Sequence, residues 1–262
     1  MNIENITVIG GRDKAGNPEP VSSVILQMGD VVSIVGPTGS GKTTLINDIE
    51  LFAYANTPTG RKVLINGELP DPEYRNSPSS NPIALITQHT TFLSDLPVHE
   101  FLNTHARIRT QYQSQVSQMV EETLDFANKL TGEPVLPSSR MTELSGGQTR
   151  SLLIADATII CNTPIVLLDE VENAGIHRTR ALELLRKYRK IFVFVTHDPR
   201  IALLSDYRIV MANGVMTKVV ETGHDEKKFS HRVSRVDDIL THLREIIRRG
   251  DTLTEKDLEG VS

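Results

Sequence analysis

The sequence is poor in cysteine and in aromatic residues: its 262 residues include one Cys, no Trp, five Tyr and seven Phe. The single cysteine, Cys161, excludes an internal disulfide framework and any zinc or iron–sulfur site built from several cysteines of one chain. This cysteine usage fits a protein from a reducing compartment. No apolar run approaches the roughly 18 residues that a membrane-spanning helix needs, so direct membrane insertion is not expected.

Positive charge is also scarce. Lys and Arg total 28 against 33 Asp and Glu, and the formal charge of −5 gives no basic surface of the kind that binds nucleic acid. The N-terminus, which begins Met1-Asn2-Ile3-Glu4, lacks the basic and apolar segments of a secretory signal peptide. We therefore expect a cytoplasmic protein, which would reach the inner face of the plasma membrane only through a partner.

A glycine-rich loop lies between a predicted strand and a predicted helix. The β-branched run Val31–Val35 predicts a buried strand, and apolar residues at helical spacing predict a helix over residues 44–52. The segment between them fits the pattern G-x-x-x-x-G-K-[ST] of a phosphate-binding loop. Its nucleotide-binding candidates are Gly36, Pro37, Thr38, Gly39, Ser40, Gly41, Lys42 and Thr43, together with the following Thr44.

Each residue type in this loop has a physical role. Glycines let successive backbone N–H groups point at an anion, and the start of the following helix adds a favourable dipole. Lys42 is expected to reach the β- and γ-phosphates of a bound nucleotide, and the Thr43 hydroxyl to bind Mg²⁺. The loop therefore predicts binding of a nucleoside triphosphate.

The rest of the chain alternates between strand and helix patterns. We expect strands at residues 3–9, 21–28, 62–67, 83–87, 165–168 and 191–195, and a hairpin over residues 208–220 closed by Asn213-Gly214. Helical patterns cover residues 98–130, 152–160 and 181–188, whereas residues 70–82 read as a surface loop.

The charged tail predicts one more helix, with Ser234 as its N-cap and Gly250 as its stop. Its apolar stripe consists of Val236, Ile239, Leu240, Leu243, Ile246 and Ile247. This stripe either packs on its own domain or docks on a second subunit or partner.

A second glycine motif decides the class. Leu144-Ser145-Gly146-Gly147-Gln148 opens a predicted helix and so forms another anion-binding nest. The motif precedes the buried strand that ends in Asp169-Glu170. With these motifs in this order, the chain resembles the ATP-binding cassette (ABC) family over roughly residues 3–222.

The resemblance implies an α/β phosphate-loop fold: a mixed sheet with a RecA-like core, an antiparallel β subdomain and a helical subdomain. It implies an ABC ATPase domain at residues 1–222, with the helical subdomain inserted at about residues 89–145, and a charged helical extension at residues 223–262.

The resemblance also implies an ATP-hydrolysing enzyme that works as a pair. Ser145, Gly146 and Gly147, with Gln148, are expected to contact the γ-phosphate held by a facing subunit, so two cassettes close head-to-tail as a homodimer or with a similar subunit.

By the same resemblance, Asp169 is expected to hold Mg²⁺, usually through water, and Glu170 to act as the general base for the attacking water. Gln88 is expected to sense Mg²⁺ or that water, and His197 to donate a hydrogen bond to the γ-phosphate.

The sequence also departs from the family. No aromatic residue precedes Phe52, so Arg12 is our candidate for stacking on the nucleotide base. The family's D-loop aspartate position falls on Ile176.

Two functions remain open at this stage: the ATP-binding subunit of a transporter with an integral membrane permease as partner, or a soluble ATPase that assembles or activates a protein complex. A phosphate-loop kinase or GTPase would not explain residues 144–148 together with His197. His99-Glu100 followed by His105 lacks the H-E-x-x-H spacing of a zinc protease.

Overall fold

A six-stranded sheet lies at the centre of the protein, with strand order β5-β6-β7-β3-β8-β9. The computed structural model describes residues 3–170 and 178–254. The first five strands of that order run parallel, and β9 pairs antiparallel with β8. The strands are β3 (Val31–Val35), β5 (Ile83–Ile86), β6 (Ile165–Asp169), β7 (Ile191–Val195), β8 (Tyr207–Ala212) and β9 (Val215–Glu221).

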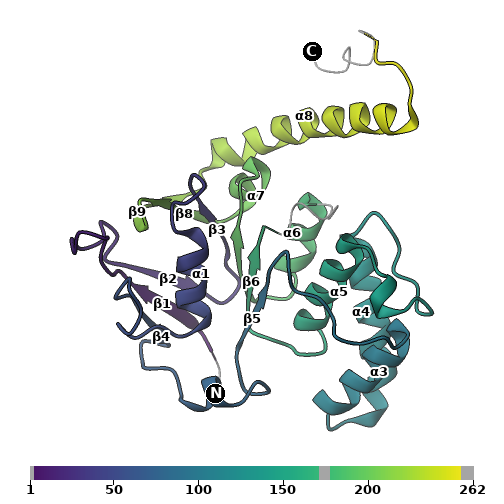
Figure 1. Ribbon diagram of the computed structural model, residues 1–262, viewed down its shortest axis with the longest axis horizontal. Coiled ribbons are helices and arrows are strands. Elements are labelled where there is room, and N and C mark those ends of the chain that lie inside the picture. The colour runs from purple at the N-terminus through teal and green to yellow at the C-terminus, as the bar shows by residue number, and fades with distance from the viewer. Residues whose placement is uncertain (1–2, 171–177, 255–262) are drawn as a thin grey trace.

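Strand β6 shows why both faces of this sheet are covered. Its four apolar residues are fully buried, and successive side chains point to opposite faces. Val166 and Leu168 join the core formed with α5 (Gly146–Thr158) and α6 (Arg178–Arg186), whereas Ile165 and Leu167 join the core formed with α1 (Lys42–Glu50). Figure 1 shows α1 on one side of the sheet and α5 and α6 on the other.

A second, antiparallel sheet has the order β2-β1-β4. It comprises β1 (Asn5–Ile9), β2 (Ser23–Gln27) and β4 (Lys62–Ile65). Ile6 and Val8 alternate with more exposed residues along β1 and pack into the same core as α1. This alternation is typical of a sheet with one buried face, and the predicted antiparallel subdomain is confirmed.

Helices α3 (Val98–Arg109), α4 (Val116–Leu130) and α5 form what we call the helical lobe. Their apolar faces extend the core that contains Val166 and Leu168, on the face of the sheet opposite α1. Among residues 3–170 and 178–254, four shorter helices connect the larger elements; α2 lies within the predicted surface loop 70–82, and η2 and α7 were not predicted. They are α2 (Glu73–Asn76), η1 (Gln113–Gln115), η2 (Met141–Glu143) and α7 (Pro199–Leu204).

The last helix, α8 (His224–Arg249), begins earlier than the sequence indicated. Its N-cap is Gly223 rather than Ser234, and its predicted stop at Gly250 is confirmed, with φ of 80°. The first turns are fixed on the domain because Arg208 donates to both carboxylate oxygens of Glu226, at 3.1 and 2.7 Å.

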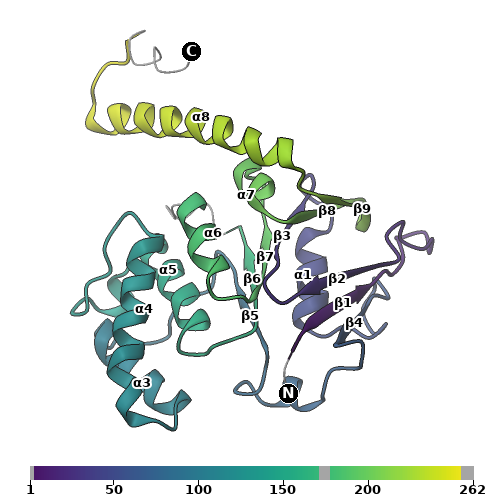
Figure 2. The same ribbon diagram turned by 180° about the vertical axis from the view of Figure 1, so that it is seen from behind.

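Beyond these turns α8 extends past the rest of the chain (Figures 1 and 2). Within the apolar stripe, Val236, Leu240 and Ile247 are 52%, 45% and 60% exposed, so the chain's own domain does not cover them. No helix among residues 3–170 and 178–254 is both long and apolar enough to cross a membrane.

Candidate nucleotide site

The phosphate-binding loop connects β3 to α1, as predicted. Gly39 and Gly41 have φ values of 77° and 95°, which residues with a side chain rarely adopt. A Cβ atom on Gly36 would lie 2.3 Å from the carbonyl oxygen of Met211, and one on Gly41 would lie 2.8 Å from the Cα of Gly214. The β8–β9 hairpin therefore packs directly on the back of the loop and requires glycine at both positions.

Lys42 is buried against this loop. Its Nζ donates to the carbonyl oxygens of Gly36 and Pro37, at 3.0 and 3.1 Å. The ammonium group is therefore held by two carbonyl groups of the loop itself. Thr43 and Thr44 follow it in the first turn of α1 and are exposed. Because α1 begins at the end of the loop, the positive end of its dipole faces the loop. The first turn, which the structure describes in full, carries no acidic residue that would offset this positive charge.

A buried arginine, which sequence patterns did not reveal, supports the loop from behind. Arg61 is fully buried and contacts Glu19, Asp48 of α1 at 2.9 Å, and the carbonyl oxygen of Gly214 at 2.8 Å. Gly214 in turn donates its N–H to the carbonyl oxygen of Ser40, at 2.9 Å. Arg61 thus links the loop, its helix and the β8–β9 turn.

The acidic pair, predicted to hold Mg²⁺ through Asp169 and to supply the general base through Glu170, lies at the carboxyl end of β6. Asp169 is the last residue of the strand, and Glu170 follows it with φ of 51°, a strained value for a residue with a side chain. The N–H of Glu170 donates to the carbonyl oxygen of Val195 at the end of β7, at 3.0 Å. This bond holds the ends of the two neighbouring strands together.

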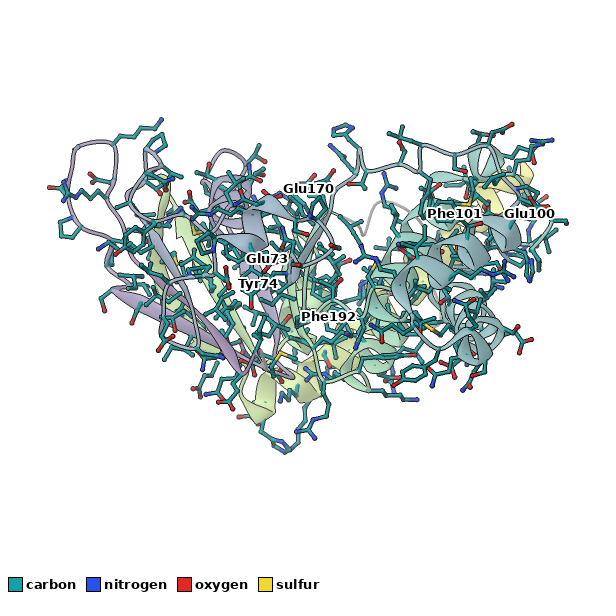
Figure 3. All side chains as sticks on the ribbon, turned by 90° about the horizontal axis from the view of Figure 1, so that it is seen from below. Glu73, Tyr74, Glu100, Phe101, Glu170 and Phe192 are labelled. Carbon is teal, nitrogen blue, oxygen red and sulfur yellow. The ribbon has the colours of Figure 1, made fainter. Side chains whose placement is uncertain are left out.

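The structure brings Glu170 and His197 together. His197 follows β7, and its Nε2 lies 3.5 Å from Oε1 of Glu170. Both side chains remain partly open to solvent, with 35% of the glutamate and 47% of the histidine exposed. Figure 3 shows Glu170 between the part of the molecule that carries Tyr74 and the helical lobe that carries Phe101.

Gln88 lies two residues beyond β5, at the same edge of the sheet. Its side-chain Nε2 is 3.1 Å from Nε2 of the exposed His89, and its carbonyl oxygen accepts a hydrogen bond from Arg150 at 2.6 Å. Arg150 belongs to α5 and also donates to the carbonyl oxygen of Gly146. Sequence reasoning missed this arginine, which joins Gln88 to the helical lobe.

The start of α5 forms a complete capping box. The Ser145 Oγ accepts from the N–H of Gln148 at 3.3 Å, and the Gln148 Oε1 accepts from the N–H of Ser145 at 2.9 Å. Ser145 Oγ also donates to Glu133. Gly146 and Gly147 therefore sit in the first turn of a well-defined helix, whose N-terminus favours anions.

The structure does not place this helix start in the same layer as the phosphate-binding loop. Helix α5 packs on one face of the six-stranded sheet and α1 on the other (Figure 2). Within one chain, the structure therefore gathers the loop, Gln88, Asp169, Glu170 and His197 at one sheet edge, and it holds residues 145–148 on the helical lobe.

Three of the gathered side chains provide oxygen atoms that suit a hard cation. They are the Thr43 hydroxyl in the first turn of α1, and the Gln88 amide and the Asp169 carboxylate at the ends of β5 and β6. Mg²⁺ prefers such oxygen ligands and keeps several waters, so this donor set fits it.

The two departures from the family have different outcomes. Arg12 is exposed, while its backbone N–H donates to the carbonyl oxygen of Thr59 at 2.7 Å. Its guanidinium is therefore accessible on an anchored backbone, and base stacking by Arg12 stays a prediction. Ile176 lies outside the described residues.

Known proteins resemble this chain over most of its length. Residues 21–173 match the family model described as ABC transporter. An uncharacterised ABC transporter ATP-binding protein of Methanocaldococcus jannaschii is 49% identical over 98% of this chain and 98% of its own length. The methionine import ATP-binding protein MetN of Chlamydia pneumoniae is 29% identical over 82% of this chain, which spans 63% of that longer protein.

A solved structure agrees at the level of fold. It is a dimeric, post-hydrolysis ATP-binding cassette with bound ADP and phosphate, which matches 83% of this chain and 99% of its own with a TM-score of 0.60 and 22% identity. The predicted ABC fold is thus confirmed by the layers of the sheet, by the site at its edge and by these relatives. The chain belongs to the ABC transporter family of ATP-binding cassettes and is an ATPase.

Proposed function

We propose that this chain is the energising subunit of a membrane transporter and works as a head-to-tail pair of cassettes around two ATP molecules. The names of its relatives support the transport role, since they include an ABC transporter ATP-binding protein and a methionine import protein. We assign the ATPase domain to residues 1–222 and a helical extension to residues 223–262, and we place the protein in the cytoplasm beside a membrane permease.

One observation carries the pairing. The phosphate-binding loop begins α1 on one face of the sheet. Residues 145–148 begin α5 on the opposite face, in the helical lobe of the same chain. A triphosphate held by the loop of one chain is therefore completed by the helix start of another. Two equivalent sites of this kind give closed twofold symmetry.

The side chains divide the work of hydrolysis. Lys42 and the loop N–H groups bind the β- and γ-phosphates, and the α1 dipole favours their charge. Glu170 accepts a proton from the attacking water, and His197, 3.5 Å away, orients Glu170 and donates to the γ-phosphate. Since phosphoryl transfer needs little covalent help, these positions account for most of what the protein contributes.

Thr43, Gln88 and Asp169 are our candidates for holding Mg²⁺, the last usually through water. When bound, the ion neutralises charge on the phosphate oxygens. The carbonyl oxygen of Gln88 also accepts the hydrogen bond from Arg150, so Gln88 connects the proposed cation site with the helical lobe.

The test separates binding from turnover. We expect Glu170→Gln to keep ATP affinity, to lower the hydrolysis rate by about 100-fold or more, and to accumulate an ATP-bound dimer in gel filtration. Lys42→Ala is the comparison variant: it should lose ATP affinity and stay monomeric. Wild-type turnover by Glu170→Gln would refute the base assignment, and a strictly monomeric Glu170→Gln protein saturated with ATP would refute the pairing.

The transport role has its own test. We expect affinity purification of the Glu170→Gln variant from its native membranes, solubilised in detergent, to recover an integral membrane protein in stoichiometric amount. Recovery of soluble proteins alone would favour the alternative, an ATPase that assembles or activates a protein complex.

A further inference from the structure

Three residues that the nucleotide site does not use meet where the helical lobe adjoins the amino end of β6 (Ile165–Asp169). His105 comes from α3, Asp156 from the last turn of α5, and Cys161 from the segment that leads into β6. One potential ligand atom of each residue lies within 4.8 Å of the other two. Because 51 and 56 residues separate the histidine from its partners, sequence spacing did not reveal the cluster.

The three side chains are already oriented toward one another. Nδ1 of His105 is hydrogen-bonded to Oδ1 of Asp156 at 2.8 Å, which turns the other ring nitrogen, Nε2, toward Cys161. The Cys161 Sγ lies 3.9 Å from that Nε2 and 3.6 Å from Oδ2 of Asp156. The backbone keeps this arrangement, since the N–H of Cys161 donates to the carbonyl oxygen of Asp156 at 2.9 Å.

These separations are close to those of a tetrahedral zinc site. Zn–S bonds of about 2.3 Å and Zn–N or Zn–O bonds of about 2.0–2.2 Å place neighbouring ligand atoms about 3.5 Å apart. The two distances from Cys161 Sγ exceed this spacing by a few tenths of an ångström, whereas the three ligand atoms together span up to 4.8 Å, so binding an ion would move Asp156 and His105 about 1 Å closer together.

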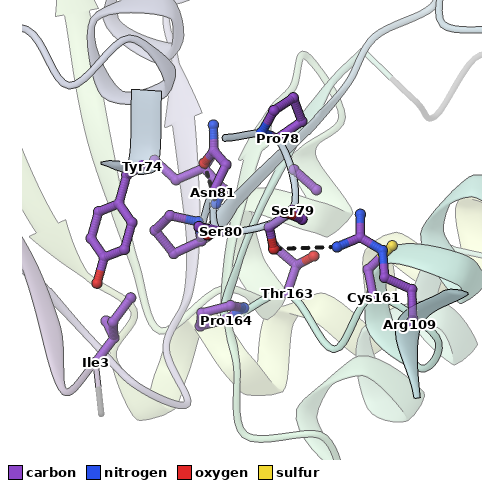
Figure 4. A pocket seen from close by; sticks show the side chains of 13 residues that line it. Ile3, Tyr74, Pro78, Ser79, Ser80, Asn81, Arg109, Cys161, Thr163 and Pro164 are labelled. Carbon is purple, nitrogen blue, oxygen red and sulfur yellow. Dashed lines mark hydrogen bonds between the residues drawn. The ribbon is translucent and has the colours of Figure 1, made fainter. Parts of the chain in front are cut away.

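We propose that His105, Asp156 and Cys161 bind one zinc-class divalent ion, with the fourth position open to water. Thiolate, imidazole and carboxylate together favour zinc-class metals over Mg²⁺ or Ca²⁺. The thiolate and the carboxylate balance the two positive charges of the ion. Cys161 is half-buried and lines a cavity of about 350 Å³, so water reaches the thiol side of the cluster (Figure 4).

Arg109 and Lys190 lie near this cluster, and their positive charges weaken its affinity for a metal ion. The Nε of Arg109 is 3.4 Å from Nε2 of His105, so this arginine competes with a metal for the same lone pair. Arg109 is exposed and also reaches the carbonyl oxygen of Ser79 across the cavity (Figure 4), so it has room to move away. Lys190 stays in place, because its Nζ donates to Asn162 and to the carbonyl oxygen of Thr163.

The proton on the histidine is the other competitor. The hydrogen bond that His105 donates to Asp156, followed by the one with Cys161, raises the pKa of His105 to about 10. A bound ion displaces that proton as well as the thiol proton, so metal binding strengthens as pH rises. The site would tie the helical lobe to the segment that enters β6, the strand that ends in Asp169.

The experiment uses Co²⁺ as a spectroscopic probe on the full-length, chelator-treated protein at pH 8. Since the chain has a single cysteine, any thiolate-to-cobalt charge-transfer band must come from Cys161. We expect one Co²⁺ per chain with that band, and its loss when Zn²⁺ is added. Cys161→Ser should remove the band, and His105→Ala should weaken Co²⁺ binding at least about 10-fold.

Two further variants make the test specific. Arg109→Ala should bind Co²⁺ more tightly than the wild type because the competing guanidinium is gone. His99→Ala, an exposed histidine on the same helix, should bind Co²⁺ unchanged. His105→Gln replaces His105→Ala if the alanine variant fails to fold by circular dichroism. Co²⁺ bound without a thiolate band, half an ion per chain, or unchanged affinity in the His105 variant would each overturn the proposal.

Discussion

Replacing Arg61 with methionine should destabilise the protein strongly. The side chains of Arg61 and Glu19 are 0% exposed and that of Asp48 is 4% exposed, so removing the arginine leaves two carboxylates in a site that water does not reach. Breaking a buried ion pair by removing one partner costs about 3–5 kcal/mol. We expect Arg61→Met to lower the free energy of unfolding by an amount in this range, measured by urea denaturation.

Two comparison proteins test the cause. Replacing the exposed Arg107 with methionine should change the free energy of unfolding by less than about 0.5 kcal/mol. Adding Glu19→Gln and Asp48→Asn to Arg61→Met should recover a large part of the loss, because the stranded charges are then gone. A loss below about 1 kcal/mol in the single variant, or no recovery in the triple variant, would refute the electrostatic account.

The same substitution should weaken ATP binding even under conditions where the variant is folded. Arg61 donates to the carbonyl oxygen of Gly214, and the N–H of Gly214 holds the carbonyl oxygen of Ser40 in the phosphate-binding loop. Without the arginine, the β8–β9 turn loses the bond that fixes it behind the loop. ATP titration of the folded variant by calorimetry measures the effect, and unchanged affinity would show that the hairpin holds the loop without Arg61.

Two shorter predictions concern a glycine and a lysine. Gly41→Ala should cost about 1–3 kcal/mol of stability and weaken ATP binding. Gly67→Ala is the control, because Gly67 has a similar positive φ of 78° but nothing lies within 4 Å of its added Cβ. It should cost only backbone strain and keep ATP affinity in the same titration. Burial lowers the pKa of Lys190 to about 8, below its value in the unfolded chain, so between pH 8 and about 10.4 the unfolded state binds more protons. The stability of the wild type relative to Lys190→Met should therefore rise with pH across this window, and a flat or falling difference in urea denaturation would contradict the assignment.

Local patterns in the sequence predicted most of the strands because their causes are local. Strand Val31–Val35 is bounded as predicted, and the Asn213-Gly214 turn has the two positive φ values, 52° and 87°, that a type I′ hairpin requires. The stop of α8 at Gly250 has the same kind of cause, since glycine readily adopts the left-handed conformation that ends a helix.

The features that were missed depend on long-range contacts. Helix α8 starts at His224 instead of after Ser234 because Arg208, in another element, fixes its first turn through Glu226. Arg61 reads as an ordinary charged residue in the sequence, yet its partner Gly214 is 153 residues away. Helix α7 spans only six residues, too few for a helical period to stand out.

The order of strands explains why the two candidate catalytic residues that the family resemblance paired lie side by side in the structure. In a parallel sheet the carboxyl ends of all strands meet at one edge, and here β7 lies between β6 and β3. A residue that follows β7 must therefore stand between the acidic pair after β6 and the phosphate-binding loop after β3. His197 occupies that position, 3.5 Å from Glu170, as the proposed contact with both the base and a γ-phosphate requires. Exchanging the order of β6 and β7 would keep every sequence motif intact and would separate this histidine from the loop by a strand.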